Sequence, residues 1–192
     1  MAEVLLFHHV QGLTPGLLDF ADTLRQAGHT VHTPDLFAGR TFASLEEGVA
    51  HASAVGFDTL TEAGVAAAAD LPARLVYAGC SLGVMPAQKL AQTRPGAAGA
   101  LLFESCVPPA TFGTGWPAGV PVQIHGMEHD EIFAGDGDLD TARALVAAHP
   151  DLASLHVYPS DVHLFADSSL PTYDAGAAAQ LTARVLDFLK NR

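Results

Sequence analysis

Short apolar segments alternate with amphipathic ones along the whole chain. The apolar segments are typical of strands buried on both faces, and they cover Val4–His8, Thr30–Thr33, Leu75–Ala78, Ala100–Phe103, Val120–His125 and Leu155–Tyr158. Strands that alternate with helices predict right-handed crossovers and a parallel sheet with helices on both faces. The pattern therefore predicts an α/β fold with a mostly parallel sheet of about six strands. We expect one domain over residues 1–192.

The segments between the strands carry helix start and stop signals. They predict helices over Pro15–Ala27, Ser44–Val55, Asp58–Ala69, Leu82–Thr93, Asp140–Ala148 and Asp174–Leu189. Thr14 is placed as an N-cap before Pro15, and Ser44 opens a capping-box pattern with Glu47. Asp140 is expected to cap the fifth helix.

Composition and charge exclude several classes of protein and of binding partner. Hydrophobic residues make up 49% of the chain and charged residues 16%, which excludes a disordered or fibrous protein. The 21 acidic and 9 basic residues give a net charge of −12, so we expect neither nucleic acid nor a membrane as a partner. The first residues read as a strand rather than a signal peptide, and two cysteines cannot form a disulfide framework. The predicted location is the cytosol, as a monomer or small homo-oligomer.

Chemistry is expected just after the strands, because ligands bind beyond the carboxyl ends of strands in such sheets. After the third strand comes Gly79-Cys80-Ser81-Leu82-Gly83, a G-x-S-x-G pattern between strand and helix. This pattern predicts a strained turn that projects Ser81 as a nucleophile, with glycines where a Cβ would collide. The alternative is an ordinary glycine-rich turn. Cys80 is one residue early and is expected to be buried and inert, as is Cys106.

A serine nucleophile needs a base and an orienting acid, which follow it in the chain in this order: serine, acid, histidine. His163 lies in the loop after the last strand and is the predicted base, against the alternative of a surface or core histidine. The loop after the fifth strand offers three carboxylates. Asp130 is the predicted acid and Glu128 its main competitor.

An oxyanion hole needs two preorganised N–H donors. The Leu82 N–H directly follows the nucleophile, and the loop after the first strand offers the Val10 N–H, with Gln11 as the alternative. His8 and His9 are candidates for the wall of the substrate pocket. No metal site is predicted, because His125 and His129 fall across a strand end and a loop rather than on one helical face.

Together, these motifs resemble the dienelactone hydrolase family of α/β-hydrolases. The resemblance spans nearly the whole chain and is carried by Phe7 to Leu13, Pro34 to Phe37, Gly79 to Gly83, Gly126 to Asp130 and Asp161 to Phe165. It implies a compact α/β-hydrolase that needs no cofactor and acts on small esters or lactones, with a triad on Ser81, Asp130 and His163. The name-giving enzymes use cysteine at the position of Ser81 and glutamate at that of His9.

The resemblance also suggests a partner for a substrate carboxylate. The family's arginine for this role has a near match in Arg40, displaced by one residue, in a loop beyond the carboxyl end of the second strand. The alternative is a surface arginine paired with Asp35 or Glu46. The leading hypothesis is therefore a serine hydrolase, and the alternative from another class is a flavodoxin-like module that binds a small ligand without covalent catalysis.

Overall fold

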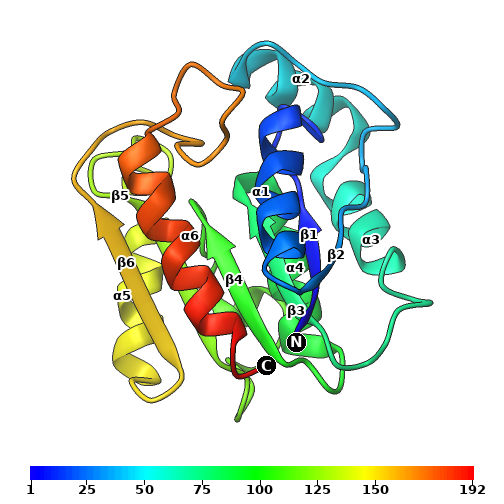
Figure 1. Cartoon of the computed structure of the whole chain (residues 1–192), viewed down its shortest axis with the longest axis vertical. Helices are drawn as coiled ribbons and strands as arrows, with labels where there is room; N and C mark the ends of the chain where they lie inside the picture. Colours follow the sequence, from blue (N-terminus) through cyan, green and yellow to red (C-terminus); the bar gives the residue numbers. More distant parts are fainter.

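The computed structural model describes residues 1–192 and contains one six-stranded parallel sheet (Figure 1). The strands are β1 (Glu3–Phe7), β2 (Thr30–His32), β3 (Val76–Cys80), β4 (Gly99–Phe103), β5 (Val122–Met127) and β6 (Ala153–Tyr158). Their order across the sheet is β2-β1-β3-β4-β5-β6, and every neighbouring pair is parallel. The predicted α/β fold with about six strands is confirmed.

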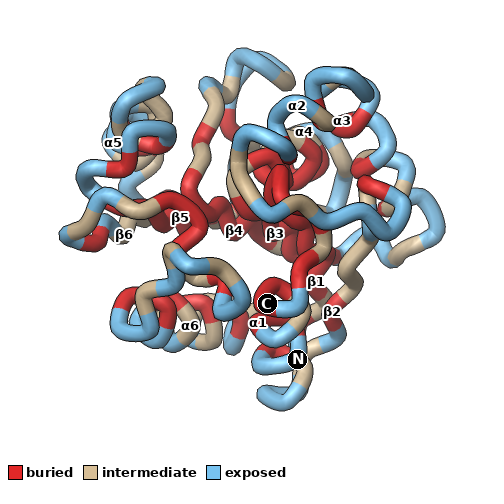
Figure 2. The backbone as a smooth tube through the Cα atoms, turned by 90° about the horizontal axis from the view of Figure 1, so that it is seen from above, coloured by how far each residue is buried: buried red, intermediate tan, exposed pale blue.

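Helices cover both faces of this sheet. They are α1 (Pro15–Gln26), α2 (Leu45–Val55), α3 (Phe57–Ala66), α4 (Val84–Thr93), α5 (Asp138–Ala148) and α6 (Ala175–Leu189), with 3-10 turns at Ser81–Gly83 and Pro109–Thr111. Helices α1 and α6 pack on one face, and the other helices lie on the opposite side (Figures 1 and 2). None of the six helices has the length and hydrophobicity that a membrane span requires.

The core is double because successive strand residues point to opposite faces. In β1, Val4 and Leu6 pack beneath α1 and α6, whereas Leu5 and Phe7 pack beneath α3 and α4. Figure 2 shows the central strands β1, β3, β4 and β5 as a buried middle layer, with helices on either side whose outer faces are exposed. Strands buried on both faces need continuous apolar runs, which explains the pattern of the sequence.

The predicted helix starts hold to within one residue except at α4 and α5. The helix expected from Leu82 begins at Val84, because the 3-10 turn Ser81–Gly83 precedes it. The side chains of Thr14, Ser44 and Asp174 accept hydrogen bonds from the first turns of α1, α2 and α6. The prediction that Asp140 caps the fifth helix is wrong. That helix begins at Asp138 after Gly137, whose φ of 95° redirects the chain, and no side chain caps it.

The order of the strands sends two neighbouring loops to opposite faces of the sheet. From β1 the chain first moves outward to β2 and then returns to the other side of β1 as β3. The loops after β1 and β3 therefore diverge at the carboxyl edge of the sheet. Such a topological switch point is where α/β sheets bind ligands.

Candidate active site

The turn after β3 is strained and depends on two glycines. Ser81 has a φ of 48°, and the chain continues through a 3-10 turn into α4. A Cβ on Gly79 would lie 2.1 Å from the Gly83 carbonyl oxygen, and one on Gly83 would lie 2.5 Å from the Phe7 carbonyl oxygen. Both positions therefore require glycine, as the steric argument from the sequence predicts.

A hydrogen-bonded chain of three side chains starts at this turn. The Ser81 hydroxyl lies 2.9 Å from His163 Nε2, and His163 Nδ1 lies 2.6 Å from Asp130 Oδ2. The Ile132 N–H donates to the other carboxylate oxygen of Asp130 at 2.9 Å. Asp130 and His163 are buried, whereas the competing acid Glu128 is exposed and takes no part. The structure thus joins the three residues that the sequence proposes as a triad.

The electrostatics of His163 suit a base. Burial by itself would lower the pKa of His163, but the hydrogen bond to Asp130 and the nearby carboxylates raise this pKa above its ordinary value. The Nδ1–H of the ring faces Asp130, which leaves Nε2 as the acceptor for the Ser81 proton.

The loop after β1 offers a free N–H group at Val10, which lines the same cavity as Ser81. The Gln11 N–H donates to His9 Nδ1 at 3.2 Å and the Gly12 N–H to the His9 carbonyl at 3.0 Å, whereas the Val10 N–H makes no hydrogen bond within the protein. Val10 and Leu82 line the same cavity as Ser81. Of the two donors considered for this loop, Val10 is the available one.

The two histidines after Phe7 hold this loop rather than line the cavity. His9 is 1% exposed, and its Nε2 lies 2.8 Å from Asp167 Oδ2. His8 accepts from the Leu36 N–H at 3.0 Å and bonds the His9 carbonyl at 2.8 Å, and burial lowers its pKa to about 4. Packing turns the His9 ring toward Asp167, and His9 does not line the cavity beside Ser81, so substrate binding by His9 stays a prediction.

Arg40 lies apart from the site. Its side chain is exposed, it lines no part of the cavity beside Ser81, and it pairs with neither Asp35 nor Glu46. Asp35 instead accepts hydrogen bonds from the backbone of its own loop, at Phe37 and Gly39. The ion pair expected as the alternative role of Arg40 is therefore absent, and its binding of a substrate carboxylate stays a prediction that the lining of this cavity does not support.

Both cysteines are buried and lack thiolate character. Cys80 points into the core beneath α1 and α6, and burial raises its pKa well above the ordinary value. Burial also raises the pKa of Cys106, to about 12. This supports the prediction that neither cysteine is a nucleophile.

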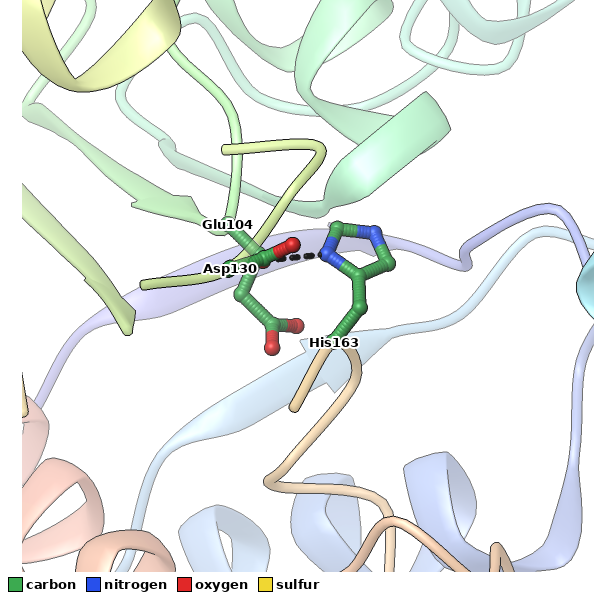
Figure 3. Close-up of side chains that lie close together, drawn as sticks. All are labelled: Glu104, Asp130 and His163. Atoms are coloured by element: carbon green, nitrogen blue, oxygen red, sulfur yellow. Dashed lines mark hydrogen bonds and ion pairs between the residues drawn. The ribbon is translucent and has the colours of Figure 1, made fainter. Parts of the chain in front are cut away.

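Glu104 is a site residue that the sequence reasoning missed. It directly follows β4, is 2% exposed and has a φ of 60°. Its side chain lies close to those of Asp130 and His163 (Figure 3). Ser81, Glu104 and Leu164 are three of the four non-glycine residues with positive φ, and such strain gathers at functional sites. The available signal was its position, since an acid after a strand end lies at the same edge as Asp130.

Glu104, Asp130 and His163 also form the one cluster with the composition of a metal site. Their ligand atoms lie within 4.8 Å of one another. A cation there would have to displace the 2.6 Å hydrogen bond between His163 and Asp130. His125 and His129 do not meet: His125 is buried, with both ring nitrogens bonded to Tyr158 and Gln123, and His129 is exposed.

A cavity of about 340 Å³ opens beside Ser81. Its lining is mostly apolar and comprises Val10, Phe57, Ser81, Leu82, Met85, Glu104, Ser105, Ile132 and Asp138. The only charged side chains are acids, and Asp138 accepts hydrogen bonds from the Ser105 hydroxyl and the Cys106 N–H. The size and lining suit a small molecule without negative charge.

Comparisons with known proteins identify the family and agree with the fold. The profile of the dienelactone hydrolase family matches residues 1–192. The dienelactone hydrolase from Anabaena variabilis is 17% identical, with a TM-score of 0.70, over 100% of this chain and 86% of that one. A dienelactone hydrolase-like promiscuous phosphotriesterase from metagenomic libraries is also 17% identical, with a TM-score of 0.71 and the same coverage. Comparison with curated proteins gave no match.

Proposed function

Since the chain belongs to the dienelactone hydrolase family and is therefore a hydrolase, we propose that it cleaves small, uncharged carboxylic esters or lactones through a serine acyl-enzyme. The observation that carries the proposal is the hydrogen-bonded chain from Ser81 through His163 to Asp130. A hydroxyl, an imidazole and a buried carboxylate in this order activate serine for attack on an acyl carbon.

In the proposed first half-reaction, Ser81 Oγ attacks the acyl carbon while its proton passes to His163 Nε2. Asp130 holds the ring in the required tautomer and stabilises the imidazolium. The negative charge on the acyl oxygen is bound by the N–H groups of Val10 and Leu82. His163 then gives the proton to the leaving alkoxide oxygen, and the acyl group stays on Ser81.

In the second half-reaction, water takes the place of the leaving group. His163 accepts a proton from the water, whose oxygen attacks the acyl-enzyme and releases the carboxylic acid. Ser81 recovers its proton from the imidazolium, so the cycle closes with no cofactor.

The cavity lining supports the restriction to uncharged substrates. Five of its nine residues are apolar, and Glu104 and Asp138 are its only charged groups apart from what the reaction generates. A substrate carboxylate would meet like charge with no cation to pair with it, which costs binding energy.

A fluorophosphonate probe tests the nucleophile, because it phosphonylates activated serines. We expect labelling of the wild type and of Cys80→Ala, and none of Ser81→Ala, with hydrolysis of short acyl esters and lactones following the same pattern. Circular dichroism serves to show that each variant is folded. Labelling that survives in Ser81→Ala would contradict the proposal, and a wild type that neither labels nor hydrolyses would support the binding-module alternative.

A further inference from the structure

Glu104 occupies an unusual position for a glutamate. It directly follows β4, its N–H donates to the His125 carbonyl at 2.7 Å, and its φ of 60° lies in the left-handed region that favours glycine. The side chain is buried at 2% exposure. Burial of a carboxyl group is costly, so the fold must gain something from this residue.

The carboxyl group lies against the catalytic pair without joining it. Glu104 Oε1 accepts a hydrogen bond from the Phe165 N–H at 3.0 Å. Its nearest carboxyl oxygen lies within 4.8 Å of ligand atoms of both His163 and Asp130, and no hydrogen bond connects it to His163 (Figure 3). At this separation in a buried site, the charge of Glu104 acts on the imidazole through space.

The surroundings of Glu104 contain no fixed positive charge. The elements that pack around Glu104 contribute titratable groups near it. These groups are Cys80 at the end of β3, Asp130 in the loop after β5, Asp138 in α5, His163 and Asp167 in the loop after β6, and His9, which pairs with Asp167. Neither of the two cavities that Glu104 lines includes a lysine or an arginine. The imidazolium of His163 is therefore the cation that an ionised Glu104 would stabilise.

We propose that Glu104 is a second carboxyl partner of His163, a positioning residue whose negative charge stabilises the imidazolium that forms during acyl transfer. This inference rests on the proposed function. Asp130 bonds the ring and fixes its tautomer, whereas Glu104 contributes charge alone. No proton passes through Glu104: the proton still moves from Ser81 Oγ to His163 Nε2.

The charge of Glu104 depends on pH near neutrality. Burial raises its pKa to about 7, repulsion from Asp130 adds to this, and the His163 charge and the Phe165 N–H oppose it. In return, Glu104 contributes to the raised pKa of His163. The two groups therefore titrate as a coupled pair, and ionisation of Glu104 makes His163 a stronger base.

The decisive variant is Glu104→Gln. Glutamine keeps an oxygen acceptor for the Phe165 N–H but never ionises, so it separates the charge from the structural bond. The matched control is Glu128→Gln, an exposed carboxylate two residues from Asp130. The measurement is kcat/KM for p-nitrophenyl acetate between pH 5 and 9.

We expect Glu104→Gln to lower the midpoint of the acid limb by about one pH unit, the effect typical of removing one nearby opposite charge. The value of kcat/KM on the alkaline plateau should fall by about tenfold in Glu104→Gln. In Glu128→Gln, the midpoint and the plateau value should both stay as in the wild type. An unchanged midpoint in Glu104→Gln would overturn the proposal. A residue with a structural role alone would change the free energy of unfolding but not the pH dependence of kcat/KM. Glu104→Asp, which keeps the charge, should keep the midpoint near that of the wild type.

A titration of the wild type covers the case in which the variants do not fold. The ring-nitrogen NMR signals of His163 should move in two steps, one of them near pH 7 as Glu104 ionises, and a single step would overturn the proposal. Hydrolysis by Ser81→Ala would instead contradict the proposed function itself. If Ser81→Ala loses activity but the pH profile of kcat/KM in Glu104→Gln is not shifted, the proposed function stands and only the proposed role of Glu104 is overturned.

Discussion

Asp167→Asn should destabilise the fold and slow the reaction, because four donors converge on this buried carboxylate. Oδ2 faces His9 Nε2 at 2.8 Å and the Thr14 hydroxyl, and Oδ1 accepts from the Ser169 N–H at 2.9 Å and the Ser169 hydroxyl at 2.6 Å. Asparagine keeps the shape, but it removes the charge and turns an NH₂ group toward a donor.

The pKa of Asp167 gives the size of the effect. Burial alone would raise this pKa, but the hydrogen bonds from His9, Ser169 and Thr14 lower it from 3.8 to about 2. A difference of this size corresponds to about 2 kcal/mol of folding free energy, of which screening by solvent leaves about 1–2 kcal/mol. The mispaired amide adds about 1 kcal/mol. We therefore expect Asp167→Asn to lower the free energy of unfolding by about 2–3 kcal/mol at pH 7.

The sign of the pH dependence follows from the lowered pKa. The folded state favours the ionised carboxylate, so its stabilisation is complete above pH 3.8 and is lost as the pH falls toward 2. The difference in the free energy of unfolding between the wild type and Asp167→Asn should therefore become smaller at acidic pH. Urea unfolding of both proteins at pH 7 and near pH 3 measures this difference.

The control is Asp161→Asn, an exposed carboxylate in the same loop, which should change stability by less than about 0.5 kcal/mol. Because His9 also holds the Gln11 N–H beside Val10, we expect kcat of Asp167→Asn to fall by about tenfold as one oxyanion donor loosens. Equal stability of the two variants at pH 7 would refute the reasoning.

Two further predictions concern the acid and the arginine. Asp130→Asn should lower kcat by about 10³- to 10⁴-fold through the wrong imidazole tautomer while the fold persists, as steady-state kinetics with circular dichroism can check; near-normal turnover would exclude Asp130 as the acid. Arg40→Ala should change KM equally for a neutral ester and its carboxylate-bearing analogue, because the exposed guanidinium lies outside the cavity. A selective rise in KM for the anionic substrate would show that Arg40 reaches the site.

Much of the site could be predicted because it depends on local rules. The apolar runs specify strands buried on both faces, and Thr14, Ser44 and Asp174 cap their helices through neighbours three or fewer residues away. The glycines around Ser81 follow from collisions within one turn and with the adjacent strand. The error at Asp140 is also local: several aspartates compete there, and the backbone turn at Gly137 decides the start of α5.

The tertiary structure decided which polar groups are buried and what they meet. Asp167 pairs with His9, 158 positions earlier in the chain, and no local pattern indicates this partner. In the sequence, Glu104 is indistinguishable from an exposed acidic residue after a strand. In the structure, packing buries it beside His163. Arg40 is turned to solvent by a loop that folds on itself. The sequence determined elements and their ends because these depend on near neighbours, whereas burial and charge pairing depend on segments that only the fold brings together.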